Sequence, residues 1–159
     1  RGYVYCRSGS GNQSRSDHRP MTMFHENQFV ATEWSTARDK AKFANHFVRF
    51  VEKGFPDSLF HKWFYTRLSM MFGHIAHYTR HGFYETWFTA ADRKRDFLVR
   101  AVESPCHGDP TFTYSDVEKV LADWASTSGH IHRLTGIHEA DVAVAERAEL
   151  ARLQAKYAT

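Results

Sequence analysis

The sequence has little cysteine and no long apolar run, and these absences narrow the classes of protein to which it can belong. Only Cys6 and Cys106 are cysteines, and they form no C-x-x-C pair. A disulfide scaffold and a thiolate zinc site are therefore not expected. No segment reaches the roughly 20 apolar residues of a transmembrane helix, and no signal-peptide pattern opens the chain. We expect a cytoplasmic protein that makes no membrane contact.

The sequence also lacks the motifs of the common enzyme and nucleic-acid-binding classes. It has no glycine-rich phosphate loop, no G-x-S-x-G, no H-E-x-x-H and no pair of catalytic carboxylates. Zinc-finger, RNP and KH patterns are also missing. The sequence by itself does not decide whether the chain is an enzyme.

Excess positive charge is confined to the first twenty residues. Residues 1–20 hold four arginines and one aspartate, whereas residues 21–159 hold 17 basic and 17 acidic side chains. The sequence pI of 8.9 is thus a property of this segment and does not indicate a nucleic-acid surface on the fold. Because residues 1–20 are rich in Gly, Ser and Arg without an apolar pattern, we expect a disordered tail. We interpret this tail as vector-derived or upstream sequence.

Aromatic residues are abundant, and 14 of the 24 lie between residues 43 and 88. The segment DSLFHKWFYTRLSMMFGHIAHYTRH, residues 57–81, carries a stripe of large apolar side chains at helical spacing: Phe60, Phe64, Leu68, Met71, Ile75 and Tyr78. A helix with so few polar positions is buried on two sides. We therefore predict one long central helix over residues 57–81.

Shorter helices are predicted on either side of this segment. Thr36 and Asp39 open a helix that ends at Gly54, over residues 36–53. Further helices are expected over residues 90–103 and 116–125. The fold class that follows is all-α: a single-domain bundle of four to five helices around the central helix, with residues 21–136 as the helical domain.

The last segment, residues 137–159, is rich in Ala, Glu and Arg and is strongly helical by propensity. Val142, Leu150, Leu153 and Tyr157 form a modest apolar stripe along it. We expect this C-terminal helix to dock on the domain or on a second copy of the chain, which would make a homodimer.

Histidine is frequent, and three of the 11 histidines recur in the second half of the predicted central helix. His74, His77 and His81 are spaced so that two of them share a helix face and can offer two nitrogens to one metal ion. Glu85 is the tentative carboxylate ligand of a Zn, Mn or Fe ion. Alternatively, these histidines bind the last carbonyls of the helix and have a structural role only.

Aromatic and basic residues alternate along the same segment. Such a surface can stack bases and neutralise phosphates, or it can bind a protein. The candidate binding residues are Trp63, Arg67, Tyr78, Arg80 and Tyr84. In the alternative interpretation, the aromatic side chains form a core and the cations are simply solvated.

Two hypotheses of function remain. In the first, the chain is a small, non-catalytic binding or regulatory protein that engages a protein or nucleic acid through a cleft beside the central helix. In the second, a metal in that cleft activates a water molecule to hydrolyse a small ester, lactone or phosphate. We favour the first because the metal ligand set is incomplete and no general base is evident. The sequence does not identify the substrate, the partner or the oligomeric state.

Overall fold

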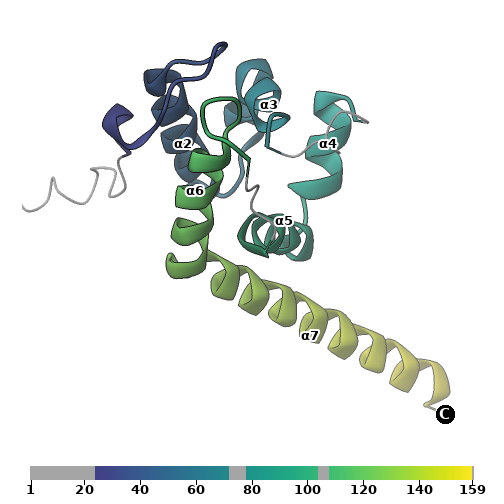
Figure 1. The fold of residues 1–159 in the computed structure, drawn as a ribbon. Helices are drawn as coiled ribbons and strands as arrows, with labels where there is room; N and C mark the ends of the chain where they lie inside the picture. The colour runs from purple at the N-terminus through teal and green to yellow at the C-terminus, as the bar shows by residue number, and fades with distance from the viewer. Residues whose placement is uncertain (1–23, 72–77, 104–107, 159) are drawn as a thin grey trace, which may run out of the picture.

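A computed structural model describes residues 24–71, 78–103 and 108–158 of the chain, and the secondary structure elements of these residues are all helices joined by turns and loops (Figure 1). No β-strand occurs within these ranges, which confirms the all-α prediction. The described part holds two short 3-10 helices and six α-helices: η1 (Glu26–Gln28), α2 (Ala37–Glu52), η2 (Asp57–Leu59), α3 (Lys62–Leu68), α4 (Arg80–Trp87), α5 (Ala91–Glu103), α6 (Ser115–Thr127) and α7 (His130–Tyr157).

The first long helix, α2, begins and ends where local chemistry predicts. The Thr36 hydroxyl accepts from the Asp39 N–H at 3.0 Å, and the Asp39 carboxylate accepts from the Thr36 N–H at 3.1 Å, which is a capping box. Beyond the helix, Gly54 takes a left-handed conformation with φ of 87°. A side chain there would strain the turn, so glycine ends the helix at little cost.

The prediction of one continuous helix over residues 57–81 is wrong. Phe60 leaves helical geometry with ψ of 51° and separates η2 from α3, and α4 begins only after the N-cap Thr79. The Tyr65 hydroxyl donates to the Tyr78 carbonyl at 2.6 Å. In a straight helix, residues 13 apart would lie about 20 Å apart. The chain therefore reverses between α3 and α4.

Side-chain bonds to the backbone explain why this segment divides. His61 Nδ1 accepts from the Phe64 N–H, which starts α3. Thr79 Oγ1 accepts from the Gly82 N–H at 3.0 Å, which starts α4. Such caps offer the backbone an alternative to continuing the helix. Gly82, the residue after the predicted central helix, lies inside α4.

The core is built largely from phenylalanine rings. Phe50 and Phe88 meet edge to face with ring centroids 5.0 Å apart, and Phe88 meets Phe97 in the same way at 4.9 Å. These contacts join α2 and α5 to Phe88, the residue that ends α4. The fully buried aromatic side chains are Phe43, Phe47, Phe50, Phe55, Phe60, Phe64, Phe83 and Phe88.

The last helix, α7, leaves the bundle at a sharp corner and extends away from it (Figure 1). Gly129, with φ of 85°, makes the corner after α6, and residues 125–136, which connect the predicted helices, are helical apart from Ser128 and Gly129. Leu134 is the one described residue of α7 that is fully buried. From Gly136 to Ala158, only His138 and Ala143 are partly buried, and the other residues are exposed. Residues 137–158 therefore do not dock on the rest of the described chain.

Candidate partner-binding cleft

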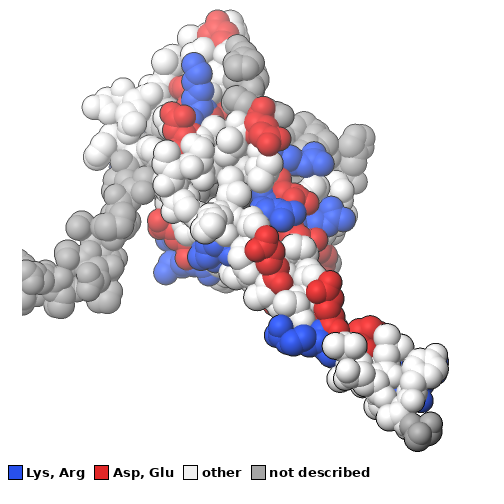
Figure 2. All heavy atoms as spheres, turned by 90° about the horizontal axis from the view of Figure 1, so that it is seen from below, with Lys and Arg blue, Asp and Glu red and all other residues white. Residues whose placement is uncertain are grey.

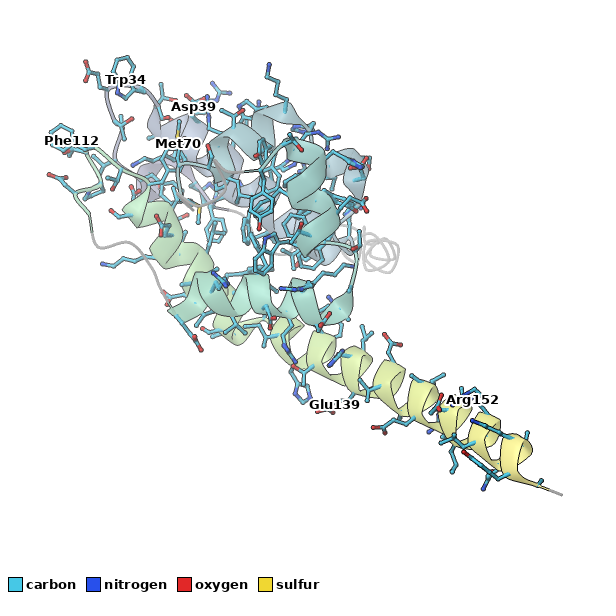
Figure 3. All side chains as sticks on the ribbon, turned by 90° about the vertical axis from the view of Figure 1, so that its right-hand side faces the viewer. Trp34, Asp39, Met70, Phe112, Glu139 and Arg152 are labelled. Atoms are coloured by element: carbon cyan, nitrogen blue, oxygen red, sulfur yellow. The ribbon has the colours of Figure 1, made fainter. Side chains whose placement is uncertain are left out.

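A cleft of about 300 Å³ lies at the end of the bundle where the N-terminus of α2 meets the turn before α6. Its apolar rim is made by Trp34, Met70 and Phe112, and these three side chains gather at one end of the molecule in Figure 3. Its remaining lining residues are polar or amphipathic: Thr32, Ser35, Thr113 and Tyr114. We call these seven residues the aromatic cleft.

Three large apolar side chains of the aromatic cleft face solvent. Trp34 is 79% exposed, Phe112 is 75% exposed and Met70 is 45% exposed. Single exposed apolar residues are ordinary on protein surfaces, but several around one concavity are typical of a binding site. Most other aromatic side chains of the described residues lie in or against the core.

The turn that carries Trp34 is held by the Thr32 hydroxyl. Its Oγ1 accepts from the N–H groups of Trp34 at 3.1 Å and Ser35 at 2.8 Å. The Thr32 N–H donates to the Ser35 carbonyl at 2.8 Å and closes the turn. A side-chain hydroxyl that satisfies two backbone donors fixes the backbone of such a turn. The Trp34 indole is thus displayed on a defined backbone.

The turn that carries Phe112 is held in a similar way by Asp109. Its Oδ1 accepts from the Thr111 N–H at 2.9 Å and from the Thr111 hydroxyl at 2.8 Å. These bonds lower the pKa of the Asp109 carboxyl, because they favour its charged form. The Asp109 carbonyl accepts from the N–H groups of Phe112 and Thr113, both at 2.9 Å. Phe112 is therefore also presented on an ordered turn.

Lys40 fastens the Phe112 turn to the bundle, and Asp116 links it to the segment that leads into the Trp34 turn. Its side chain is fully buried, and its Nζ donates to the carbonyls of Pro110 at 2.8 Å and Thr113 at 3.0 Å. It also forms an ion pair with Asp116 Oδ1 at 2.9 Å. The other carboxylate oxygen of Asp116 accepts from the Val30 N–H at 2.9 Å. One buried cation thus ties α2, α6 and both connecting segments together, and a buried charge persists only with such partners.

Tyr114 and Ser35 form the floor of the aromatic cleft. The Tyr114 hydroxyl donates to Ser35 Oγ at 2.9 Å, and both residues are buried. Burial raises the pKa of the Tyr114 phenol, and the nearby Arg67 cation acts in the opposite direction. Arg67 lies one turn before Met70, and its buried Nε has no hydrogen-bond partner among the described residues. The Arg67 cation is therefore close enough to Tyr114 to affect the phenol, although Arg67 does not line the cleft.

Three other residues predicted to bind a partner make contacts within the fold. Arg80 donates to the Phe60 carbonyl at 2.7 Å. The Tyr84 hydroxyl donates to the Phe55 carbonyl at 2.6 Å. The Tyr78 ring packs edge-on against the core residue Phe83, with centroids 5.3 Å apart.

Trp63, the remaining candidate, is covered by cations rather than open to a ligand. Lys42 Nζ lies 4.7 Å from its ring centroid, and the Arg67 guanidinium carbon lies 5.7 Å away. Of the five candidates, Arg67 is the one that the structure brings close to the aromatic cleft.

The predicted metal ligands are described only in part. His74 and His77 lie outside the described residues. His81 Nε2 and Glu85 Oε2 are 4.0 Å apart on successive turns of α4, and both side chains are mostly exposed. Within the described ranges, no three His, Cys, Asp or Glu residues lie close enough to hold a metal ion. The hydrolase hypothesis gains no support from these residues.

Trp34, Phe112 and Lys40 are not among the residues predicted from the sequence to form a site. Two short patterns contain Trp34 and Phe112: T-x-W-S at residues 32–35 and D-P-T-F-T at residues 109–113. Both place an aromatic residue beside Thr or Asp, which are residues that stabilise turns. Neither pattern indicates that the two turns are neighbours in space.

Comparison with known proteins adds no further assignment. No protein-family model matches the chain, and no curated protein or solved structure matches it. Among the helices of the described residues, none is both long and apolar enough to cross a bilayer.

Proposed function

We propose that this chain is a non-catalytic binding protein that engages a protein partner through the aromatic cleft. The single observation that carries the proposal is the exposure of Trp34 and Phe112 on two ordered turns around one concavity. Tryptophan at the centre of an interface contributes more binding energy than most residues. Because both turns are fixed before binding, little conformational entropy is lost when a partner docks.

The partner we propose inserts an apolar side chain between Trp34 and Phe112. The rim is apolar, while Thr32, Ser35, Thr113 and Tyr114 line the cleft with polar groups that can contact a peptide backbone. A protein segment has this combination of apolar side chains and backbone polar groups.

Nucleic acid fits the aromatic cleft less well. Exposed aromatic rings can stack bases, but affinity for nucleic acid depends on Lys and Arg contacts to phosphates. No Lys or Arg lines the aromatic cleft. Figure 2 shows basic and acidic side chains interspersed on the face of the bundle that it presents.

The test uses peptides selected from a displayed random library against the full chain. The dissociation constant of a selected peptide is measured by calorimetry for the parent chain, Trp34→Ala and Phe112→Ala. Each substitution is expected to weaken binding about tenfold or more. Val30→Ala is the matched control, because Val30 is apolar and 45% exposed but does not line the cleft. Peptides that bind both cleft variants as tightly as the parent chain would refute the proposal.

A second measurement separates protein from nucleic-acid partners. Single-stranded DNA and RNA oligonucleotides are titrated into a chain that lacks residues 1–20, so that the basic segment makes no contribution. We expect no binding that depends on Trp34. Oligonucleotide binding that Trp34→Ala abolishes would replace the protein partner with nucleic acid.

A further inference from the structure

The exposed part of α7 is a helix with nothing packed against it in the described chain. Residues 137–157 extend about 30 Å at 1.5 Å per residue. In proteins, most helical stability comes from the packing of one helix face and not from the propensity of the residues. The segment also exposes large apolar side chains, among them Leu150 at 55% and Tyr157 at 72%. Both facts point to an occupant that covers this helix.

Four of the six large apolar side chains exposed along residues 137–157 share one side of the helix, whereas Ile137 and Val144 lie on the opposite side. At 100° per residue, Val142, Leu150, Leu153 and Tyr157 fall within an arc of about 80°. The arc spans the exposed length from near its start to its free end. It is broad enough to pack against one other helix.

Charge is divided along the same helix. Residues 137–146 contain Glu139, Asp141 and Glu146 and no Lys or Arg. Residues 147–157 contain Arg147, Arg152, Lys156 and a single acid, Glu149. In Figure 3, Glu139 lies nearer the bundle and Arg152 nearer the free end. The exposed helix is therefore acidic in its first half and basic in its second half.

This charge pattern is complementary to itself when one copy is reversed. If two copies lie antiparallel, the acidic half of each lies along the basic half of the other. If they lie parallel, like charges face each other over the whole length, which is unfavourable. A two-fold axis also lets the same surface serve both copies, as in most dimers.

We infer that two copies of this chain pair through residues 137–157 of α7, antiparallel and centred near Ala148. This register overlaps the two exposed segments fully and sets Val142 of each copy beside Leu153 of the other. Arg152 already binds Glu149 of its own helix through Nε and Nη2, with a shortest distance of 2.6 Å. A guanidinium has five N–H groups, so further N–H groups of Arg152 are available to an acid of the second copy.

The first test measures self-association by analytical ultracentrifugation over a range of concentrations. The parent chain is expected to sediment at twice the monomer mass of 18.5 kDa as the concentration rises. Leu150→Ala with Leu153→Ala is expected to weaken self-association about tenfold or more. Both residues are remote from the core, so the double variant keeps a folded bundle, which thermal melting checks.

The charge test mixes two complementary variants. One carries Glu139→Lys, Asp141→Lys and Glu146→Lys, and the other carries Arg147→Glu, Arg152→Glu and Lys156→Glu. Each alone places like charges together and is expected to stay monomeric at concentrations where the parent chain dimerises. An equimolar mixture is expected to form heterodimers. Failure of the mixture to associate would show that charge does not guide the pairing.

The direction of pairing is read from spin labels in a chain with Cys6→Ser and Cys106→Ser. Labels are placed at Ala148→Cys or Ala155→Cys, which lie on the side away from the apolar arc. In the antiparallel dimer, the two Ala155 positions are offset by about 20 Å along the helix axis, whereas the two Ala148 positions lie side by side. The label-to-label distance is therefore longer at position 155. Equal distances at both positions would show a parallel pair and overturn the inference.

The inference does not rest on the aromatic cleft, and the two can fail separately. Trp34→Ala with Phe112→Ala is expected to leave self-association unchanged, and Leu150→Ala with Leu153→Ala to leave peptide binding unchanged. A parent chain that remains monomeric at every concentration would overturn the dimer while leaving the proposed function in place.

Discussion

At the scale of single residues, Lys40 determines how the aromatic cleft is built. Its ammonium group makes three close contacts to oxygen, to two carbonyls of the Phe112 turn and to the Asp116 carboxylate. The geometry satisfies all three protons of the ammonium group. The cleft is thus supported by a charge that lies beneath it and takes no part in its rim.

Replacing Lys40 with Met tests this role. The substitution leaves Asp116 and two carbonyls without their buried donor, and breaking a buried ion pair costs about 3–5 kcal/mol. We expect the free energy of unfolding, measured by urea denaturation, to fall by this amount. Lys42→Met is the control, because Lys42 is exposed and contacts only the Trp63 ring among the interactions described. Equal stability of the Lys40 variant and the parent chain would contradict the role.

His46 makes the stability depend on pH. Its Nε2 bonds the Leu59 carbonyl at 2.7 Å, and its Nδ1 bonds Arg49 Nη2 at 3.0 Å. A carbonyl only accepts and a guanidinium only donates, so the ring is neutral with its proton on Nε2. Burial, reinforced by the Arg49 charge, lowers the pKa of His46 below 6.5 despite the opposing effect of the Leu59 bond.

Because the folded-state pKa is lowered, the unfolded chain takes up the proton first as the pH falls. The contribution of His46 to stability is therefore complete above pH 6.5 and is lost as the pH falls from there through the folded-state pKa. We expect the free energy of unfolding to decrease between about pH 7 and pH 5. His46→Gln is expected to flatten this slope, and His81→Gln, at an exposed position, to leave it unchanged.

At the scale of helices, local caps set the boundaries more than the apolar stripe does. The stripe through residues 57–81 has the spacing of one helix, yet His61 and Thr79 each start a new one. A straight rod would leave two apolar sides to cover. Folding back at the Tyr65–Tyr78 bond lets α3 and α4 cover each other's rings, and Tyr65 and Phe83 meet with centroids 6.2 Å apart.

Gly129 sets the direction of α7. Its φ of 85° is left-handed, which costs a residue with a side chain about 1 kcal/mol or more. We expect Gly129→Ala to lower stability by about 1 kcal/mol in urea melts. Gly136→Ala is the control, because Gly136 lies in the helix with no atom close to its missing side chain. That substitution is expected to raise helix stability by up to about 1 kcal/mol.

At the scale of the whole molecule, the bundle and the exposed part of α7 are energetically separate. Ending the chain after Gly136 removes residues that bury almost nothing against the bundle. We expect the shortened chain to melt within a few degrees of the parent chain measured at low concentration, and to bind cleft peptides equally well. It is expected to be monomeric. A large fall in melting temperature at low concentration would show that α7 stabilises the bundle from within one chain.

A dimer formed through α7 carries two aromatic clefts, one on each bundle. Two linked sites can bind a partner with two matching segments more tightly than either site alone, provided that the partner spans the distance. We expect a peptide dimer with a long flexible linker to bind the parent chain more tightly than the single peptide. The variant Leu150→Ala with Leu153→Ala is expected to lose this advantage.

The sequence by itself determined what depends on neighbours along the chain: the all-α class, the capping box of α2, its end at Gly54 and the helical propensity of the C-terminal segment. These features follow from periodicity, caps and backbone freedom within a few residues. Tertiary structure decided the rest. The division of residues 57–81 and the meeting of the Trp34 and Phe112 turns over Lys40 depend on bonds between residues 13 to 76 positions apart, which spacing along the chain does not reveal.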